Sequence, residues 1–231
     1  MNERLIEILL QAFPKILIPC IKITIPLTII SYLLGILLAL FLALVQVANI
    51  KGLKQLARLY IWIFRGTPLL VQLFIIFFGL PSIGITLEAF PSAVIAFALN
   101  LAAYNAEVIR SAILAVSEGQ TEAAFMAGLS YPQLMFWIVL PQAARIAFPP
   151  LFNSLIGLTK DTSLASNITV IEMFSVAQQV AARYYEPFAL YCEAALIYLI
   201  ICTLLTVLQS YMEKRMTWEK PQGKKEVPLN A

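Results

Sequence analysis

The sequence contains five apolar segments, each long enough to cross a lipid bilayer as a helix. They lie at residues 23–48, 59–80, 89–115, 143–165 and 188–212. A crossing helix needs about 20 residues, and open strands are excluded because they would leave backbone groups unpaired in lipid. Hydrophobic residues make up 61% of the chain and charged residues only 13%, unlike soluble domains. The sequence therefore predicts an all-α, polytopic membrane protein with five transmembrane helices.

The chain divides into three parts by the distribution of charged residues. Residues 1–22 read as an amphipathic lead-in at the membrane surface, residues 23–213 as one transmembrane domain, and residues 214–231 as a basic cytoplasmic tail. Lys51, Lys54 and Arg58 follow the first span with no acidic residue among them. Since cytoplasmic loops carry an excess of Lys and Arg, we expect the N-terminus outside and the C-terminus in the cytoplasm.

Several function classes are disfavoured by composition. The chain has no histidine and three scattered cysteines, so the common metal and general-base sites are largely closed off. Its net charge is +3, and its basic residues gather at loop ends, so we expect them to orient the chain rather than bind nucleic acid. The chain also lacks the G-x-x-x-x-G-K-[ST] loop that holds ATP. We therefore expect no cofactor and no metal in this chain.

The loop at residues 117–141 contains local sequence signals for two short helices. We expect a short helix over residues 121–129, with Gly128 allowing a turn near its end. Ser130 and the following Pro132 predict the start of a second helix. That helix should stop or kink before Pro141, since proline removes a backbone donor. Two short helices between two spans are typical of an element that binds another protein.

This loop matches the pattern E-A-A-x(3)-G-x(9)-I-x-L-P. The named positions are filled by Glu122, Ala123, Ala124, Gly128, Ile138, Leu140 and Pro141. The pattern resembles the cytoplasmic loop of the membrane subunits of bacterial ABC importers. The flanking runs RGTPLLVQLFIIFFGLP (65–81), AAYNAEVIRSAI (102–113), PQAARIAFPPLFNSLIGLTKDTSLAS (141–166) and EAALIYL (193–199) are similar to polar amino-acid permeases of the histidine, glutamine and cystine type. The resemblance covers residues 24–216.

The resemblance implies a type I importer permease in the bacterial cytoplasmic membrane. It implies that separate ATPase subunits bind ATP and Mg²⁺ and receive the coupling helix with its Glu122, Ala123, Ala124, Gly128, Leu140 and Pro141. Five spans are too few to enclose a pathway, so we expect a second permease chain, identical or related. An extracytoplasmic binding protein would deliver the amino acid.

Lys160 and Asp161 are the polar pair that most suggests a substrate site. Charges inside a span are costly and usually face a cavity, although a structural ion pair between helices is the simpler alternative. Adjacent residues on a helix do not face each other, so a mutual salt bridge is not expected. A free amino acid needs a cation for its carboxylate and an anion for its ammonium group. We expect Lys160 and Asp161 in these roles, with Thr162 and Ser163 beside them and backbone groups from an unwound segment near Gly157.

Two further features lie in the second span. Arg65, Gly66, Thr67 and Pro68 should kink that span. They either anchor it at the membrane interface or, as the resemblance implies, form an inner gate. Gln72 is a candidate pore residue, with a hydrogen bond to a neighbouring helix as the alternative.

The reading from sequence is thus a permease subunit that moves a polar L-amino acid, such as cystine or glutamine, by alternating access. Two alternatives stay open. A secondary amino-acid transporter is weakened by the absence of an inverted repeat within the chain. A membrane-embedded enzyme using Lys160 and Asp161 is weakened by the absence of histidine and of a placed nucleophile.

Overall fold

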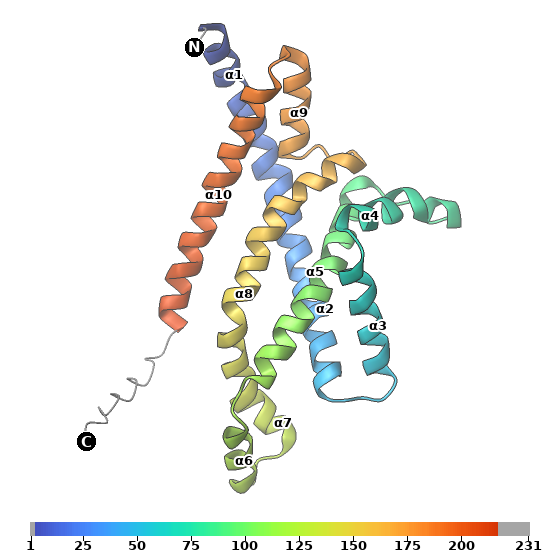
Figure 1. Ribbon diagram of the computed structural model, residues 1–231, viewed down its shortest axis with the longest axis vertical. Helices are drawn as coiled ribbons and strands as arrows, with labels where there is room; N and C mark the ends of the chain where they lie inside the picture. The colour runs from blue at the N-terminus through green and yellow to red at the C-terminus, as the bar shows by residue number, and fades with distance from the viewer. Residues whose placement is uncertain (1–2, 217–231) are drawn as a thin grey trace, which may run out of the picture.

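The computed structural model describes residues 3–216, and every regular element in this range is helical (Figure 1). The α-helices are α1 (Glu3–Pro19), α2 (Ile25–Val47), α3 (Leu53–Gly66), α4 (Leu69–Phe74), α5 (Ala89–Leu114), α6 (Glu118–Met126), α7 (Tyr131–Leu134), α8 (Leu140–Asp161), α9 (Met173–Tyr184) and α10 (Pro187–Met216). Three π-helical turns join some of them: η1 (Cys20–Thr24), η2 (Ile75–Gly79) and η4 (Met135–Val139). Two 3-10 turns are η3 (Leu80–Ile83) and η5 (Thr162–Ile168). The predicted all-α class is confirmed.

Among the described residues, four continuous helical stretches are long and apolar enough to cross a membrane. They are Glu3–Val47, Ala89–Leu114, Tyr131–Ile168 and Pro187–Met216. A further candidate is the pair Leu53–Gly66 and Leu69–Ile83, whose two parts are bent by 106°. The predicted total of five spans is therefore reached only if this bent pair is one crossing.

The N-terminal segment differs from the separate lead-in expected over residues 1–22. Helix α1 runs into α2 through the π-helical turn η1 with no break at that boundary. The wider turn lies directly before Pro26, so it accommodates the proline ring and its missing N–H. Ile8, Ala12 and Ile16 are buried against residues of α9 and α10. The segment is thus the first part of one long helix. Its apolar face packs against other helices of the protein instead of lying on the membrane surface.

The core lies where α5 packs between α2, α3 and α8. The buried face of α5 is rich in alanine, with Ala93, Ala96, Ala102, Ala103 and Ala106 fully buried. Small residues let membrane helices approach closely. On α2, a Cβ added to Gly35 would lie only 2.6 Å from Leu101 Cδ2 and 3.1 Å from the Ala98 carbonyl oxygen. The close packing of these two helices therefore depends on the glycine.

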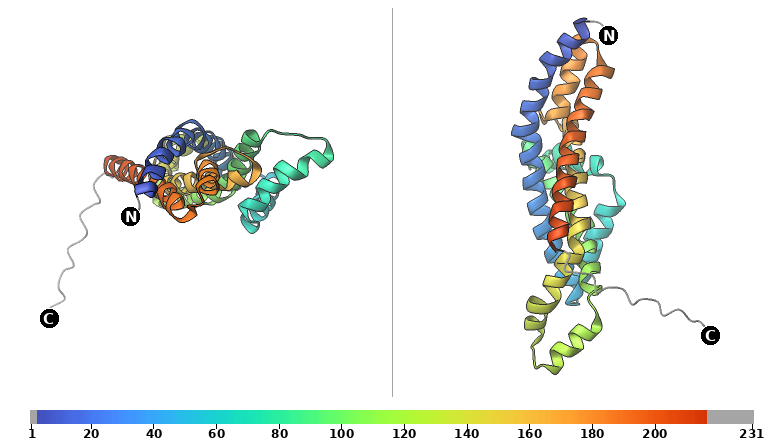
Figure 2. Two further views of the ribbon diagram at one scale, coloured as in Figure 1. Left: turned by 90° about the horizontal axis from the view of Figure 1, so that it is seen from above. Right: turned by 90° about the vertical axis from the view of Figure 1, so that its left-hand side faces the viewer.

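The helix expected to stop or kink before Pro141 does not stop there but continues through the proline, and the irregularity before it is a π-helical turn. The chain is helical from Tyr131 to Ile168, and the π-helical turn η4 ends immediately before Leu140 and Pro141. The wider turn absorbs the proline in the same way as η1. Helices α6 and α7 form one end of the molecule, beyond the ends of the longer helices (Figure 2).

The expected boundary between the transmembrane domain and a tail at 214–231 does not interrupt helix α10, which continues to Met216. The remainder of that tail, residues 217–231, lies outside the described residues. Of the predicted spans, the one at 143–165 is longer than expected, since its helix already begins in the loop at 117–141.

Candidate functional site

A sharp break between α3 and α4 opens the interior of the helix bundle. Thr67 and Pro68 have extended backbone angles, with ψ values of 145° and 138°. Proline disfavours a helical conformation in the residue before it, which ends α3 at Gly66. The predicted kink is confirmed: the helices on its two sides, Leu53–Gly66 and Leu69–Ile83, are bent by 106° relative to each other.

The Gln72 side chain closes this break from inside. Its Nε2 donates to the Phe64 carbonyl oxygen at 2.9 Å and to Thr67 Oγ1 at 2.8 Å, with the Thr67 carbonyl oxygen at 3.1 Å. Its Oε1 accepts from Asn100 Nδ2 at 3.0 Å. Gln72 is 5% exposed, and both the nitrogen and the oxygen of its amide form hydrogen bonds. Gln72 therefore bonds the freed end of α3 to α5, which matches the simpler of its two sequence interpretations.

A pocket of about 440 Å³ lies beside the break, between α5 and α8. We call it the break pocket. Its polar lining consists of Thr67, Asn100, Tyr104, Ser154 and Asp161, and its other residues are Pro68, Leu69, Phe97, Leu101, Gly157, Leu158 and Leu164. One carboxylate, one amide and three hydroxyls thus converge on a mainly apolar cavity, which is the usual make-up of a small-molecule site.

Sequence reasoning found Asp161 and Thr67 but missed Asn100, Tyr104 and Ser154. The available signal was polar spacing: Asn100 and Tyr104 are four residues apart on α5 and share one face. Ser154 Oγ accepts a 2.9 Å hydrogen bond from Asn105 Nδ2, which joins α8 to α5. Helix α5 therefore both lines the pocket, through Asn100 and Tyr104, and holds the wall formed by α8, through Asn105.

Lys160 and Asp161 do not share one cavity. Asp161 lines the break pocket, whereas Lys160 and Ser163 line a second pocket of about 490 Å³ against α9 and α10. The two side chains form no ion pair with each other, within the part of the chain that the structure describes. Both residues end the regular helix α8, and consecutive side chains point about 100° apart. The expected zwitterion site is thus divided between two faces.

The other residues of that expected site also separate. Thr162 is fully buried, and its hydroxyl donates to the Thr159 carbonyl oxygen at 2.7 Å. Ser163 Oγ donates to the Lys160 carbonyl oxygen at 2.8 Å. Gly157 lies inside regular helix, so the unwound segment expected there is absent. The chain tightens into a 3-10 turn only from Thr162 onward.

A second polar region continues from the break pocket toward the turn between α2 and α3. Tyr104 lines both the break pocket and a neighbouring pocket of about 460 Å³ that also contains Arg58, Trp62, Arg65 and Glu107. The Arg65 guanidinium carbon lies 5.4 Å from the centre of the Tyr104 ring, a cation–π arrangement. Arg65 and the break at Thr67 are therefore adjacent to the same polar face of α5, whereas Gly66 is exposed with free space around it.

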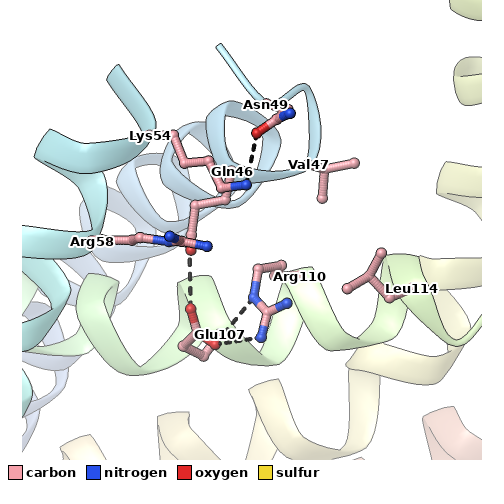
Figure 3. A pocket seen from close by; sticks show the side chains of 8 residues that line it. All are labelled: Gln46, Val47, Asn49, Lys54, Arg58, Glu107, Arg110 and Leu114. Carbon is pink, nitrogen blue, oxygen red and sulfur yellow. Dashed lines mark hydrogen bonds and ion pairs between the residues drawn. The ribbon is translucent and has the colours of Figure 1, made fainter. Parts of the chain in front are cut away.

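The next pocket along this face, of about 550 Å³, lies at the end of α2 (Figure 3). Arg110 donates two hydrogen bonds to Glu107 Oε2, at 3.1 Å and 2.8 Å, and the two residues lie three apart on α5, a spacing at which side chains of a helix meet. Gln46 Nε2 donates to the other carboxylate oxygen at 3.3 Å. On the opposite wall, Lys54 Nζ donates to Asn49 Oδ1 at 2.7 Å. This pocket is called the terminal pocket below.

The EAA loop folds as two short helices at the far end of the molecule (Figure 1). Gly128 has a φ of +79° and turns the chain after α6, and Gln133 Oε1 accepts from the Ser130 N–H at 2.9 Å at the start of α7. Ala124 is buried, packed with Leu134 and other core residues. The remaining surface is open, with Glu122, Ala123, Gly128 and Pro141 exposed and Leu140 partly buried.

Comparison with known proteins places this architecture among transport proteins. Residues 31–218 match the family described as "Binding-protein-dependent transport system inner membrane component". The chain is 47% identical over 211 residues to the L-cystine transport system permease protein TcyB of Bacillus subtilis (strain 168), covering 91% of this chain and 90% of the relative. It is 36% identical over 213 residues to a putative glutamine transport system permease protein, GlnP, of Rickettsia felis (strain ATCC VR-1525 / URRWXCal2), covering 91% and 98%.

Solved structures agree with this assignment. A chain of an amino acid ABC transporter crystallised with histidines superposes with a TM-score of 0.86 and is 34% identical, covering 93% of this chain and 100% of that one. A chain of the inward-facing MetNI methionine ABC transporter superposes with a TM-score of 0.72 over 94% and 100% of the two chains. At 18% identity, the second likeness shows the fold alone.

Proposed function

This chain belongs to the family of binding-protein-dependent transport system inner membrane components, and on that basis we propose how it moves its substrate. It is a multi-pass membrane component of an ABC importer for amino acids, and a transport subunit rather than an enzyme. Members of the family work with ATPase and substrate-binding partners. The break pocket is the feature on which the proposal rests, because it brings a carboxylate and several neutral polar groups together beside a bent helix.

We propose that Asp161 receives the ammonium group of the amino acid in the break pocket. The Tyr104 hydroxyl can donate or accept a hydrogen bond to a neutral polar side chain, and the Asn100 amide oxygen can accept one. The Thr67 and Ser154 hydroxyls can only accept, because they already donate to backbone carbonyl oxygens of their own helices. The high identity to a cystine permease, and the absence of a second acidic residue from the lining, support cystine or another neutral polar amino acid such as glutamine.

The carboxylate of the substrate needs a cation. Arg65 is next to the break pocket through Tyr104, and we propose it as the carboxylate partner in this conformation. Lys160, the sequence-based candidate, opens on the other side of α8. Lys160 stays a candidate for the carboxylate partner in another conformation, one in which α8 has rotated. Substitution of Arg65 and of Lys160 distinguishes the two candidates.

We also propose an orientation. Figure 1 has the α2–α3 turn, which carries Lys51 and leads into the start of α3 with Lys54, at the same end as α6 and α7. If that basic turn is cytoplasmic, then α6 and α7 are cytoplasmic too, and the N-terminus lies outside. The face that carries the break pocket, between α5 and α8, would meet a second permease chain, identical or related, so that the break pockets of both chains enclose the pathway.

In this orientation, the EAA loop contacts the ATPase. The exposed apolar side chains Phe125, Met126, Phe136 and Trp137 give it the surface that a partner groove would cover. Glu122 adds a charged contact at its edge. ATP and Mg²⁺ would be bound by the ATPase, whose closure moves α6 and α7 and, through the continuous helix of α7 and α8, shifts the wall that carries Asp161.

The test is uptake of labelled L-cystine by proteoliposomes that contain the permease, its ATPase and its binding protein. Asp161→Asn should reduce uptake of every carried amino acid by roughly 30-fold or more, because the bound substrate would cover this carboxylate, and loss of one partner of a covered charge pair costs about 2–5 kcal/mol. Arg65→Met should do the same, and Lys160→Met should have a smaller effect. Near-normal uptake with Asp161→Asn in an assembled complex would refute the assignment. If Lys160→Met reduced uptake as strongly as Asp161→Asn while Arg65→Met left uptake normal, Lys160 and not Arg65 would be the partner of the substrate carboxylate.

A further inference from the structure

The terminal pocket contains positive charge that the described residues do not neutralise. Glu107 is already bonded by Arg110 and Gln46, so one cation and one anion cancel. Within residues 3–216, Lys54 bonds only to the neutral Asn49 side chain. Arg58 forms no ion pair and no hydrogen bond with any of residues 3–216. The pocket therefore keeps a surplus of two positive charges.

The two surplus cations come from one wall of the pocket. In Figure 3, Lys54 and Arg58 of α3 face Glu107 and Arg110 of α5, with Gln46 of α2 between them. Lys54 and Arg58 are one helical turn apart, so both side chains reach the same space. That space, about 550 Å³, is large enough for a phosphodiester group and its glycerol.

Helix α3 also has the apolar surface that acyl chains require. Leu56, Leu59, Trp62 and Ile63 are exposed, Trp62 by 72%. Trp62 lines the neighbouring pocket together with Arg58 and Arg65. Tryptophan and arginine side by side at the end of a span are typical of the membrane–water interface. A soluble anion would use the cations but would leave this apolar surface uncovered.

We propose that the terminal pocket binds the headgroup of an anionic phospholipid, with the phosphate held by Lys54 and Arg58 and the acyl chains along the exposed face of α3. The proposal rests on the orientation given above, in which this end of α3 lies at the cytoplasmic face of the membrane. Basic pockets between helices on that face suit anionic headgroups. The bound lipid would fill the space between the α2–α3 turn and α5, next to Arg65.

Quenching of Trp62 by brominated lipid tests the site directly. The full chain, with Trp137→Phe and Trp218→Phe, is placed in phosphatidylcholine vesicles that contain 20 mol% of either dibrominated phosphatidylglycerol or dibrominated phosphatidylcholine. We expect stronger quenching by the anionic lipid. Arg58→Gln should lower its apparent affinity by roughly 5-fold, and Lys54→Gln with Arg58→Gln by roughly 30-fold, from about 1 kcal/mol per basic residue near an anionic surface.

Lys51→Gln is the matched control, because Lys51 carries the same charge and lies three residues before Lys54 but does not line the pocket. It should change the affinity by less than about 2-fold. Equal effects of Lys51→Gln and Arg58→Gln would mean general surface attraction and would overturn the proposal. So would equal quenching by the two lipids, or relief of quenching by 10 mM inorganic phosphate, which would assign the cations to a soluble anion. Because no transport is measured, these results are independent of the substrate assignment.

Discussion

Removal of the Gln72 amide should loosen the break between α3 and α4 without changing which amino acid is preferred. Gln72→Met keeps the length of the side chain and deletes its polar end. Four hydrogen bonds are then lost: those to the Phe64 carbonyl oxygen at 2.9 Å, the Thr67 hydroxyl at 2.8 Å and the Thr67 carbonyl oxygen at 3.1 Å, and the one from the Asn100 amide at 3.0 Å. Hydrogen bonds between membrane helices contribute roughly 0.6 kcal/mol each and at most about 1.7. We expect the free energy of unfolding to fall by about 2–3 kcal/mol.

Two assays separate this effect from a role in reading the substrate. Thermal unfolding in detergent, followed with a thiol-reactive dye, should show the loss of stability. Competition by a panel of amino acids should give an unchanged ranking, with uptake of all substrates reduced together. Gln142→Met is the matched control, since its amide only donates to the Ile138 carbonyl oxygen of its own helix at 3.0 Å, and it should cost less than about 1 kcal/mol. An unchanged stability with an altered ranking would refute the reasoning and make Gln72 a side-chain reader.

Three further predictions follow from the packing, the buried charge and the orientation. Gly35→Ala should lower the free energy of unfolding by about 1–3 kcal/mol, because its Cβ would lie 2.6 Å from a side-chain carbon of α5 and overpacking costs this much; Gly66→Ala, which meets no atom within 4 Å, should be nearly neutral in the same denaturation assay. Burial raises the pKa of Glu172, in the connection between η5 and α9, from 4.5 to about 7, so the folded protein binds an extra proton between these values and its stability should fall as the pH rises from about 4.5 to 7; Glu172→Gln should remove that dependence, and a wild-type profile that rises over this range would contradict it. In a cysteine-free background, an impermeant thiol reagent should label Ser82→Cys from outside and Lys54→Cys only after lysis, and the reverse pattern would overturn the orientation.

Local sequence patterns predicted the elements that depend on local chemistry. The apolar runs predicted helices, since any crossing segment must satisfy its own backbone. The Thr67–Pro68 pair predicted the break, because proline restricts the residue before it. In the EAA loop, Gly128 predicted a turn, and the positive φ at that residue fits it.

Features that depend on packing between distant segments were not predicted. Pro141 was expected to stop or kink a helix, but the helix continues through it by means of the π-helical turn Met135–Val139. Lys160 and Asp161 were expected to share a site, yet the packing of α8 between α5 and α10 turns them into different pockets. Asn100 acquires its place in the break pocket only when α5 meets the bent helix. Its spacing from Tyr104 shows that the two share a face of α5, but not which segment that face meets.

ATP dependence of uptake tests the central claim most directly. Proteoliposomes with this permease, its ATPase and its binding protein should accumulate labelled L-cystine when ATP is supplied to the ATPase side, and should not do so with a non-hydrolysable analogue or with a proton gradient alone. The double variant Glu122→Lys, Gly128→Leu, altered only in the EAA loop, should insert normally and lose this uptake while basal ATP hydrolysis persists. Uptake that a proton gradient drives without the ATPase, or normal ATP-driven uptake by the double variant, would contradict the account.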